Sequence, residues 1–160
     1  MSPTHLHLLL NHVPVLGTVF CLGLFTLGFW RKSDELKRTA LGVFVAVSLF
    51  TVPVYLTGEP AEETVQSLPG VSKAILEQHD RAAAYAFIGV IVTGVAALAG
   101  LLYFRRERVQ PVWYACLMLG GALIVSGLMA WTANFGGQIR HTEIRPKAIH
   151  ATPPGDKDYE

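Results

Sequence analysis

Charged residues are absent from four long stretches of the chain and crowd into the segments between them. Residues 1–30, 39–58, 82–104 and 109–139 contain no Asp, Glu, Lys or Arg. Each stretch is near or above the roughly 20 residues that an apolar helix needs to cross a bilayer. A soluble helical domain would instead carry charges along the solvent face of every helix. The pattern therefore predicts four membrane-spanning helices.

Turn signals and charges place these helices at about 13–30, 39–57, 82–104 and 112–135. The first helix can begin as early as residue 4, and Pro14 predicts a kink or a helix start there, since proline lacks a backbone N–H. The two short loops, 31–38 and 105–111, make their flanking helices antiparallel neighbours. We expect an all-α, up-down four-helix membrane bundle over residues 1–145.

The longer connection between the second and third spans predicts short helical structure. Pro60 suits a first helical turn, where Glu62 and Glu63 are favourable near the N-terminus. Ser72 is a suitable N-cap for a helix that continues through His79 into the third span. Residues 146–160 are rich in Pro and polar residues, so we expect an extended tail.

Net charge is small, but its distribution predicts an orientation. The 160 residues include 13 Lys plus Arg and 12 Asp plus Glu, for a net charge of +1. The two short loops hold seven basic residues, namely Arg31, Lys32, Lys37, Arg38, Arg105, Arg106 and Arg108. The positive-inside rule places these loops in the cytoplasm and both termini in the periplasm. We therefore expect a multi-pass protein of the bacterial inner membrane.

The same pattern excludes several classes of protein. An ordinary cytosolic enzyme and a nucleic-acid binder with a basic face do not fit four charge-free spans. Only two cysteines occur, both within apolar stretches, so a disulfide scaffold is not expected. No Lys or Arg precedes residue 31. The first apolar segment therefore lacks the positive n-region of a cleavable signal peptide and should remain a span.

Histidine is the candidate chemistry of this chain. All six histidines fall on the predicted outer side, and they are His5, His7, His12, His79, His141 and His150. Histidines at a membrane boundary are costly and hence functional candidates, and imidazole is the commonest protein ligand for metals and a frequent ligand of haem iron. His150 lies in the tail and His5 near the chain end, where ordinary interfacial placement explains them. His7, His12, His79 and His141 are the candidate ligands.

The heights of the candidate histidines along their helices can be compared, but they do not select a pair of ligands. At 1.5 Å per residue, His12 lies about 28 Å from Arg31 and His7 about 36 Å from it, if the first helix is continuous. His79 lies about 39 Å from Arg105 by the same count. His7 matches His79 better than His12 does, but a tilt or a kink at the proline would change this comparison.

Neighbouring residues fit a haem site but have ordinary alternatives. Ala82 and Ala86 follow His79 and leave room for a macrocycle, although small residues equally serve helix packing. Gly136 and Gly137 precede His141 and allow close backbone approach. Three cations lie near the histidines, namely Arg81, Arg140 and Arg145. They suit any of three roles: binding the carboxylates of haem propionates, contacting lipid headgroups, or forming ion pairs with nearby glutamates. Asn134, expected to be buried in the fourth span, needs either a histidine or a neighbouring helix as its partner.

The segment from His7 to Pro14 reads His-Leu-Leu-Leu-Asn-His-Val-Pro. It resembles the His-x4-His-x-Pro opening of a bacterial family of small four-helix membrane proteins of unknown function. Thr57-Gly58, His79 and the Gly136-Gly137 pair are similar to further landmarks of that family. The resemblance covers most of residues 4–145 and implies a membrane bundle with a polar histidine site, without an established reaction.

Three functions remain open from the sequence. The first is a b-type haem electron-transfer subunit of a respiratory or photosynthetic complex, which would take electrons from quinol or a periplasmic carrier and would not be a self-contained enzyme. A c-type haem is excluded because no Cys-x-x-Cys-His motif occurs. The second is a copper, iron or zinc site at the four candidate histidines, with Glu59, Glu62 or Glu63 as a possible oxygen ligand. The third is a cofactor-free accessory subunit of a larger membrane complex.

Overall fold

The computed structural model describes residues 2–104 and 110–145, and every regular element in these ranges is a helix. Four helices are long and apolar enough to cross a membrane, at Thr4–Trp30, Asp34–Val65, Lys73–Tyr103 and Val112–Arg140. The prediction of an all-α bundle of four spans is confirmed. The length and apolar composition of the four helices indicate a multi-pass membrane protein. The predicted tail, 146–160, lies outside the described residues.

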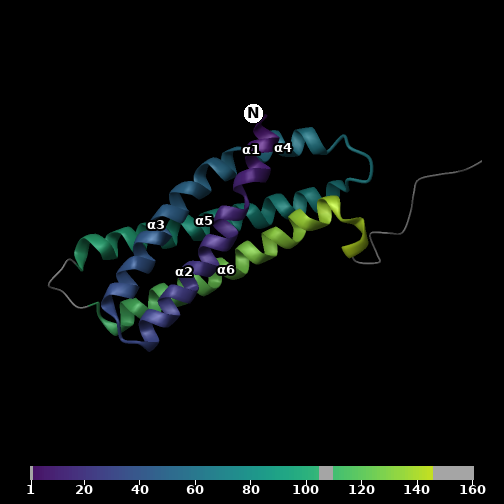
Figure 1. Cartoon of the computed structure of the whole chain (residues 1–160). Helices are drawn as coiled ribbons and strands as arrows, with labels where there is room; N and C mark the ends of the chain where they lie inside the picture. Colours follow the sequence, from purple (N-terminus) through teal and green to yellow (C-terminus); the bar gives the residue numbers. More distant parts are fainter. Residues whose placement is uncertain (1, 105–109, 146–160) are drawn as a thin grey trace, which may run out of the picture.

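The individual elements are α1 (Pro3–Leu10), α2 (His12–Trp30), α3 (Asp34–Leu56), α4 (Gly58–Val65), α5 (Lys73–Tyr103), α6 (Val112–Arg140) and the short 3-10 helix η1 (Thr142–Ile144). Around the bundle, α2 packs on α3, α3 on α5, α5 on α6, and α6 on α2. Figure 1 shows two long hairpins, α2–α3 and α5–α6, lying side by side, with α1 and α4 together at one end.

The two ends of the bundle differ, and we name them for their residues. The histidine end holds α1, α4, the start of α5 and the end of α6. The basic end holds the turn at 31–33, which follows α2, together with the end of α5 and the start of α6 (Figure 1). His7 and His79 both lie at the histidine end, because the hairpins run in the same direction.

Local sequence explains how the helices begin and break. The first span divides at Asn11, which separates α1 from α2, and Pro14 lies in the first turn of α2, where its missing N–H is tolerated. Ser33 caps α3 by accepting a hydrogen bond from the Leu36 amide at 3.3 Å. The short helix expected around Pro60 is α4. The helix α5 begins directly after Ser72, although the Ser72 side chain makes no capping hydrogen bond.

The bundle is apolar both inside and outside. Its interior is filled by side chains that are almost completely inaccessible, among them Phe25, Leu41, Phe44, Val90, Met118 and Val125. Large apolar side chains also cover the outer faces of the helices, for example Leu16, Phe20, Leu49, Ile88, Val92 and Ile124. A water-exposed bundle would not present such extensive apolar surface, whereas lipid tails solvate it.

Candidate functional site

His7 is held by the end of the third helix. Its side chain comes from α1 and is half-buried, and its Nδ1 lies 3.0 Å from the carbonyl oxygen of Val54. The hydroxyl of Thr57 lies 3.4 Å from the same nitrogen. A carbonyl oxygen can only accept a hydrogen bond, so Nδ1 of His7 carries the proton and donates. The ring also packs on Gly58, where an added Cβ would lie 3.6 Å from Cε1.

His79 is held in the same way by the end of the fourth span. Its half-buried ring comes from α5, and its Nδ1 donates to the carbonyl oxygen of Thr132 at 3.1 Å. The ring packs on Gly136, where an added Cβ would lie 3.3 Å from Cε1. In both cases a glycine stands four residues after the accepting carbonyl and leaves that carbonyl open to a second hydrogen bond.

These hydrogen bonds determine what the two imidazoles offer. When the neutral ring holds its proton on Nδ1, Nε2 keeps a free lone pair. Histidines that bind metals usually have this arrangement, with the other ring nitrogen donating to a carbonyl or a carboxylate, which fixes the ring orientation. His7 is also close enough to His79 for an electrostatic interaction between them. The structure thus brings together two oriented imidazoles from α1 and α5.

The other candidate histidines stand apart from this pair. His12, the first residue of α2, is exposed, and its side chain makes no hydrogen bond among the described residues. His141 is the exposed C-cap of α6, with its Nδ1 2.9 Å from Oε1 of Glu143. A backbone hydrogen bond to the carboxylate, together with the bond from His141, lowers the pKa of Glu143 from its ordinary value. His5 is exposed, and His150 lies outside the described residues.

The three candidate cations are placed around the histidine end in different ways. Arg81 is exposed, and its Nε donates to the Glu77 carbonyl of its own helix at 3.3 Å. Arg140 is exposed in the last turn of α6. Arg145 donates to the carbonyl oxygens of Gln138 and Ile139, at 2.8 and 3.0 Å, and so satisfies carbonyls at the end of α6.

The small residues and Asn134 have different roles from those expected for a haem pocket. Ala82 and Ala86 are 0% and 1% exposed, so both are packed within the bundle. This placement agrees with the alternative that they serve helix packing. Asn134 is exposed on α6. The expectation that it is buried was wrong, because its position on the helix turns it away from the bundle interior.

Sequence reasoning missed one polar group close to the pair. Oδ1 of Asn11 is buried and has no hydrogen-bond partner among the described residues. This side chain lies at the break between α1 and α2, within the segment from His7 to Pro14. Burying an unpaired amide oxygen costs free energy, so this atom is a candidate acceptor for a ligand or a water molecule. The only signal for it in the sequence is a polar residue within an apolar helix.

No set of protein ligands sufficient for a typical structural metal site is assembled in the part of the chain that the structure describes. Within residues 2–104 and 110–145, no group of three or more His, Cys, Asp or Glu side chains is arranged to hold a metal ion. Zinc and copper sites normally use three or four protein ligands. The two-histidine pair is therefore the best-organised candidate site.

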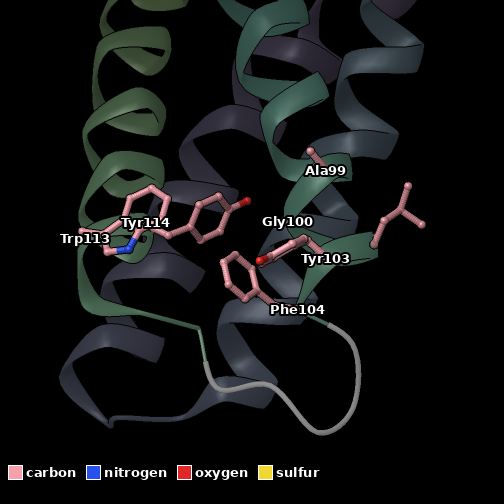
Figure 2. Close-up of a pocket in the computed structure, with 7 residues that line it drawn as sticks. Ala99, Gly100, Tyr103, Phe104, Trp113 and Tyr114 are labelled. Atoms are coloured by element: carbon pink, nitrogen blue, oxygen red, sulfur yellow. The ribbon is translucent and has the colours of Figure 1, made fainter.

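A hollow lies at the basic end, and its chemistry differs from that of the histidine pair. It is an open, apolar depression between α5 and α6, lined by Ala99, Gly100, Leu102, Tyr103, Phe104, Trp113 and Tyr114. Figure 2 shows the Tyr114 ring reaching from α6 toward Gly100 of α5. The Tyr114 hydroxyl donates to the Ala96 carbonyl at 2.9 Å. Aromatic residues of this kind are typical of a membrane–water interface.

Comparison with known proteins adds no family. No protein-family model, no curated protein and no solved structure matches this chain.

Proposed function

We propose that the chain is a b-type haem electron-transfer subunit that uses His7 and His79 as the ligands of the haem iron. The observation that carries the proposal is the pair of hydrogen bonds to Val54 and Thr132, which holds Nδ1 of each ring on a helix-end carbonyl and leaves Nε2 free. Haem iron accepts one or two axial imidazoles, so two oriented histidines are a sufficient set. A bound haem would supply one-electron chemistry.

The number of ligands favours haem over a non-haem metal. A copper, iron or zinc site at all four candidate histidines would need His12 and His141 beside the pair, and both are exposed elsewhere. Two imidazoles alone leave a zinc or copper ion short of its usual protein ligands. In a haem the porphyrin supplies four further nitrogen ligands, so two histidines complete the iron coordination.

The protein would contribute orientation and electrostatics. The carbonyls of Val54 and Thr132 fix the ring tautomers and increase the basicity of Nε2. Arg81 and Arg140, both exposed at the histidine end, are the candidates to meet the propionates. On the orientation predicted from loop charges, this end faces the periplasm of a bacterial inner membrane. Quinol or a periplasmic carrier within a respiratory or photosynthetic complex would then be the electron donor.

The decisive measurement is a reduced-minus-oxidised absorption spectrum of the protein purified from haem-replete cells, combined with haem extraction. We expect a b-type Soret band that shifts on reduction. A protein that binds no haem under these conditions would contradict the proposal. Metal analysis of the same sample would then separate a metal-binding protein from a cofactor-free accessory subunit.

The orientation has its own test. A C-terminal reporter that is active only in the cytoplasm should remain silent, because the basic turns should be retained inside. A strong signal from this reporter would reverse the orientation and place the histidine pair at the cytoplasmic face.

A further inference from the structure

The two hairpins carry the same landmarks at the same spacing. The series His7, Gly17 and Gly28 of the first hairpin recurs with identical intervals as His79, Gly89 and Gly100 of the second. The interval between the two glycines of each series is close to three helical turns, so Gly17 and Gly28 share one face of α2, and Gly89 and Gly100 share one face of α5. The partner helices carry a second series, because the interval from Val47 to Gly58 equals the interval from Val125 to Gly136.

The contacts between these landmarks also match. A Cβ on Gly17 would lie 2.6 Å from Val47, and one on Gly89 would lie 3.4 Å from Val125. Nearer the basic end, Gly28 faces Lys37 and Leu36, and Gly100 faces Tyr114. At the histidine end the equivalent contacts are the hydrogen bonds of His7 and His79. Two constant sequence offsets therefore relate the hairpins. The offset from His7 to His79 relates their first helices, and the offset from Val47 to Val125 relates their second helices.

Burial follows the same two offsets at most inward positions, although Leu41 and Val54 of α3 are buried while their counterparts Leu119 and Thr132 in α6 are only half-buried. The buried residues of α2 are Pro14, Thr18, Cys21, Phe25 and Gly28. Their counterparts in α5 at the first offset are all buried, namely Ala86, Val90, Thr93, Ala97 and Gly100. In α3 the buried Lys37, Ala40, Phe44, Val47, Ser48 and Thr51 correspond at the second offset to the buried Ala115, Met118, Ala122, Val125, Ser126 and Met129 of α6. Side-chain sizes differ, but most of the inward positions agree.

The packing between the hairpins has the symmetry that a duplication requires. The second helix of the first hairpin, α3, packs on the first helix of the second hairpin, α5, and correspondingly α6 packs on α2. A two-fold axis along the bundle exchanges these two interfaces. The same axis exchanges α1, which carries His7, with the first turns of α5, which carry His79.

We infer that the chain is a tandem repeat of one helical hairpin, and that the His7–His79 pair is a two-fold-related ligand site at the bundle axis, with Gly58 and Gly136 as its equivalent positioning residues. Each repeat supplies one imidazole, one accepting carbonyl and one glycine that keeps that carbonyl accessible. A ligand suited to this site would accept one imidazole from each repeat. This last step, from the repeat to the ligand, rests on the proposed haem function.

The repeat can be tested without any cofactor. Spin labels at exposed Phe20 and Ile124 span one interface between the hairpins, and labels at Val92 and Ala46 span the equivalent interface. Both pairs would be placed in a background lacking Cys21 and Cys116. The two-fold axis predicts the same most populated label-to-label distance for both pairs in double electron–electron resonance measurements. Clearly different distances would overturn the repeat, whatever the protein binds.

The positioning role of the glycines can be tested on the cofactor-free protein by nitrogen NMR of its histidines, about two pH units above the ordinary imidazole pKa. In the wild type, His7 and His79 should both show a protonated Nδ1 and an unprotonated Nε2. Gly136→Val should remove this pattern for His79 alone, and Gly58→Val for His7 alone. The matched controls are Gly42→Val and Gly127→Val, since nothing lies within 4 Å of a Cβ at either position.

The haem-loaded protein gives the second measurement. Each glycine variant at the site should convert part of the low-spin signal of two-histidine coordination to high spin, while both control variants retain the wild-type spectrum. Unchanged histidine tautomers in Gly58→Val and Gly136→Val would overturn the positioning role. A wild type with the expected tautomers and distances but no haem would instead leave the repeat standing and contradict the proposed function.

Discussion

The first hairpin places its histidine through a broken helix, and the second places its histidine through a continuous one. His7 lies on α1, which Asn11 separates from α2, whereas His79 lies within the uninterrupted 31 residues of α5. Both rings nevertheless donate from Nδ1 to the carbonyl four residues before a glycine. The comparison shows that the same hydrogen bond is obtained by two kinds of support, one depending on tertiary contacts and the other on helix rigidity.

The support of His7 comes from a separate short helix, whereas the equivalent segment of the second hairpin is the continuous end of α6. The helix α1 packs on α4, and the hydroxyl of Thr4 donates to that of Thr64 at 3.0 Å. The fit around Gly58 is also looser than around Gly136, with 3.6 Å against 3.3 Å to Cε1 of the respective histidine. We therefore expect His7 to tolerate perturbation better than His79.

The largest expected effect separates the two histidines. On the proposed function, His79→Ala should abolish haem binding, because it removes the proposed ligand on the rigid helix. His7→Ala should retain some haem in a high-spin form with one protein ligand, since His79 stays oriented by Thr132. Absorption spectra and haem content of both variants measure this difference.

The controls for this comparison are the histidines that lie apart from the pair. His12→Ala, His141→Ala and His150→Ala should all keep the wild-type spectrum. A wild-type spectrum in His79→Ala, or loss of haem in His12→Ala, would require a different ligand pair.

The next effect concerns packing within each hairpin. Gly17→Ala should lower the free energy of unfolding by about 1–3 kcal/mol, because its Cβ would meet Val47 at 2.6 Å in a packed interior. Gly89→Ala should be neutral or stabilising by up to about 1 kcal/mol, since its nearest contact is 3.4 Å and alanine favours the helix. Unfolding in detergent micelles compares the two. Equal destabilisation would show that the hairpins are packed alike at this level.

A smaller effect tests the support that is particular to His7. Thr4→Val removes the hydrogen bond to Thr64 and should cost about 1 kcal/mol, mostly as loosening of α1 on α4. Haem dissociation should become a few times faster, while the ligand set stays the same. Thr26→Val is the matched control, because the Thr26 hydroxyl bonds only to the Leu22 carbonyl of its own helix, at 2.8 Å. Equal haem dissociation rates in both variants would show that contact with α4 does not help to hold His7 in place.

The smallest effect lies at the end of the second hairpin. The pKa of Glu143 is lowered by a backbone hydrogen bond and by His141, so the charged carboxylate stabilises the folded state. This contribution is present above the ordinary carboxyl pKa and is lost as the pH falls through the lowered value. Glu143→Gln should therefore reduce the acid-side pH dependence of thermal stability slightly, since the pair is exposed. Identical pH profiles would show that the ion pair has no measurable role.

Several features follow from the sequence alone because they depend on local hydrophobicity. The charge-free stretches predicted all four spans, and Pro60 and Ser72 predicted α4 and the start of α5. The predicted end of the fourth helix was less accurate. The helix α6 continues to Arg140, beyond the expected 112–135, because helices extend past the apolar region into the interface.

The choice among the histidines was decided only by tertiary structure. Spacing matched His7 to His79 in height but left His12 and His141 as alternatives, because a sequence does not specify how a kinked helix turns its faces. The decisive contacts join residues far apart in the chain, His7 with Val54 and His79 with Thr132. They exist because two antiparallel helices meet in a register that brings a glycine beneath each ring. Side-chain packing along both hairpins sets that register. Few identical residues mark the repeat in the sequence, so it is recognised mainly from the matching contacts in the two hairpins.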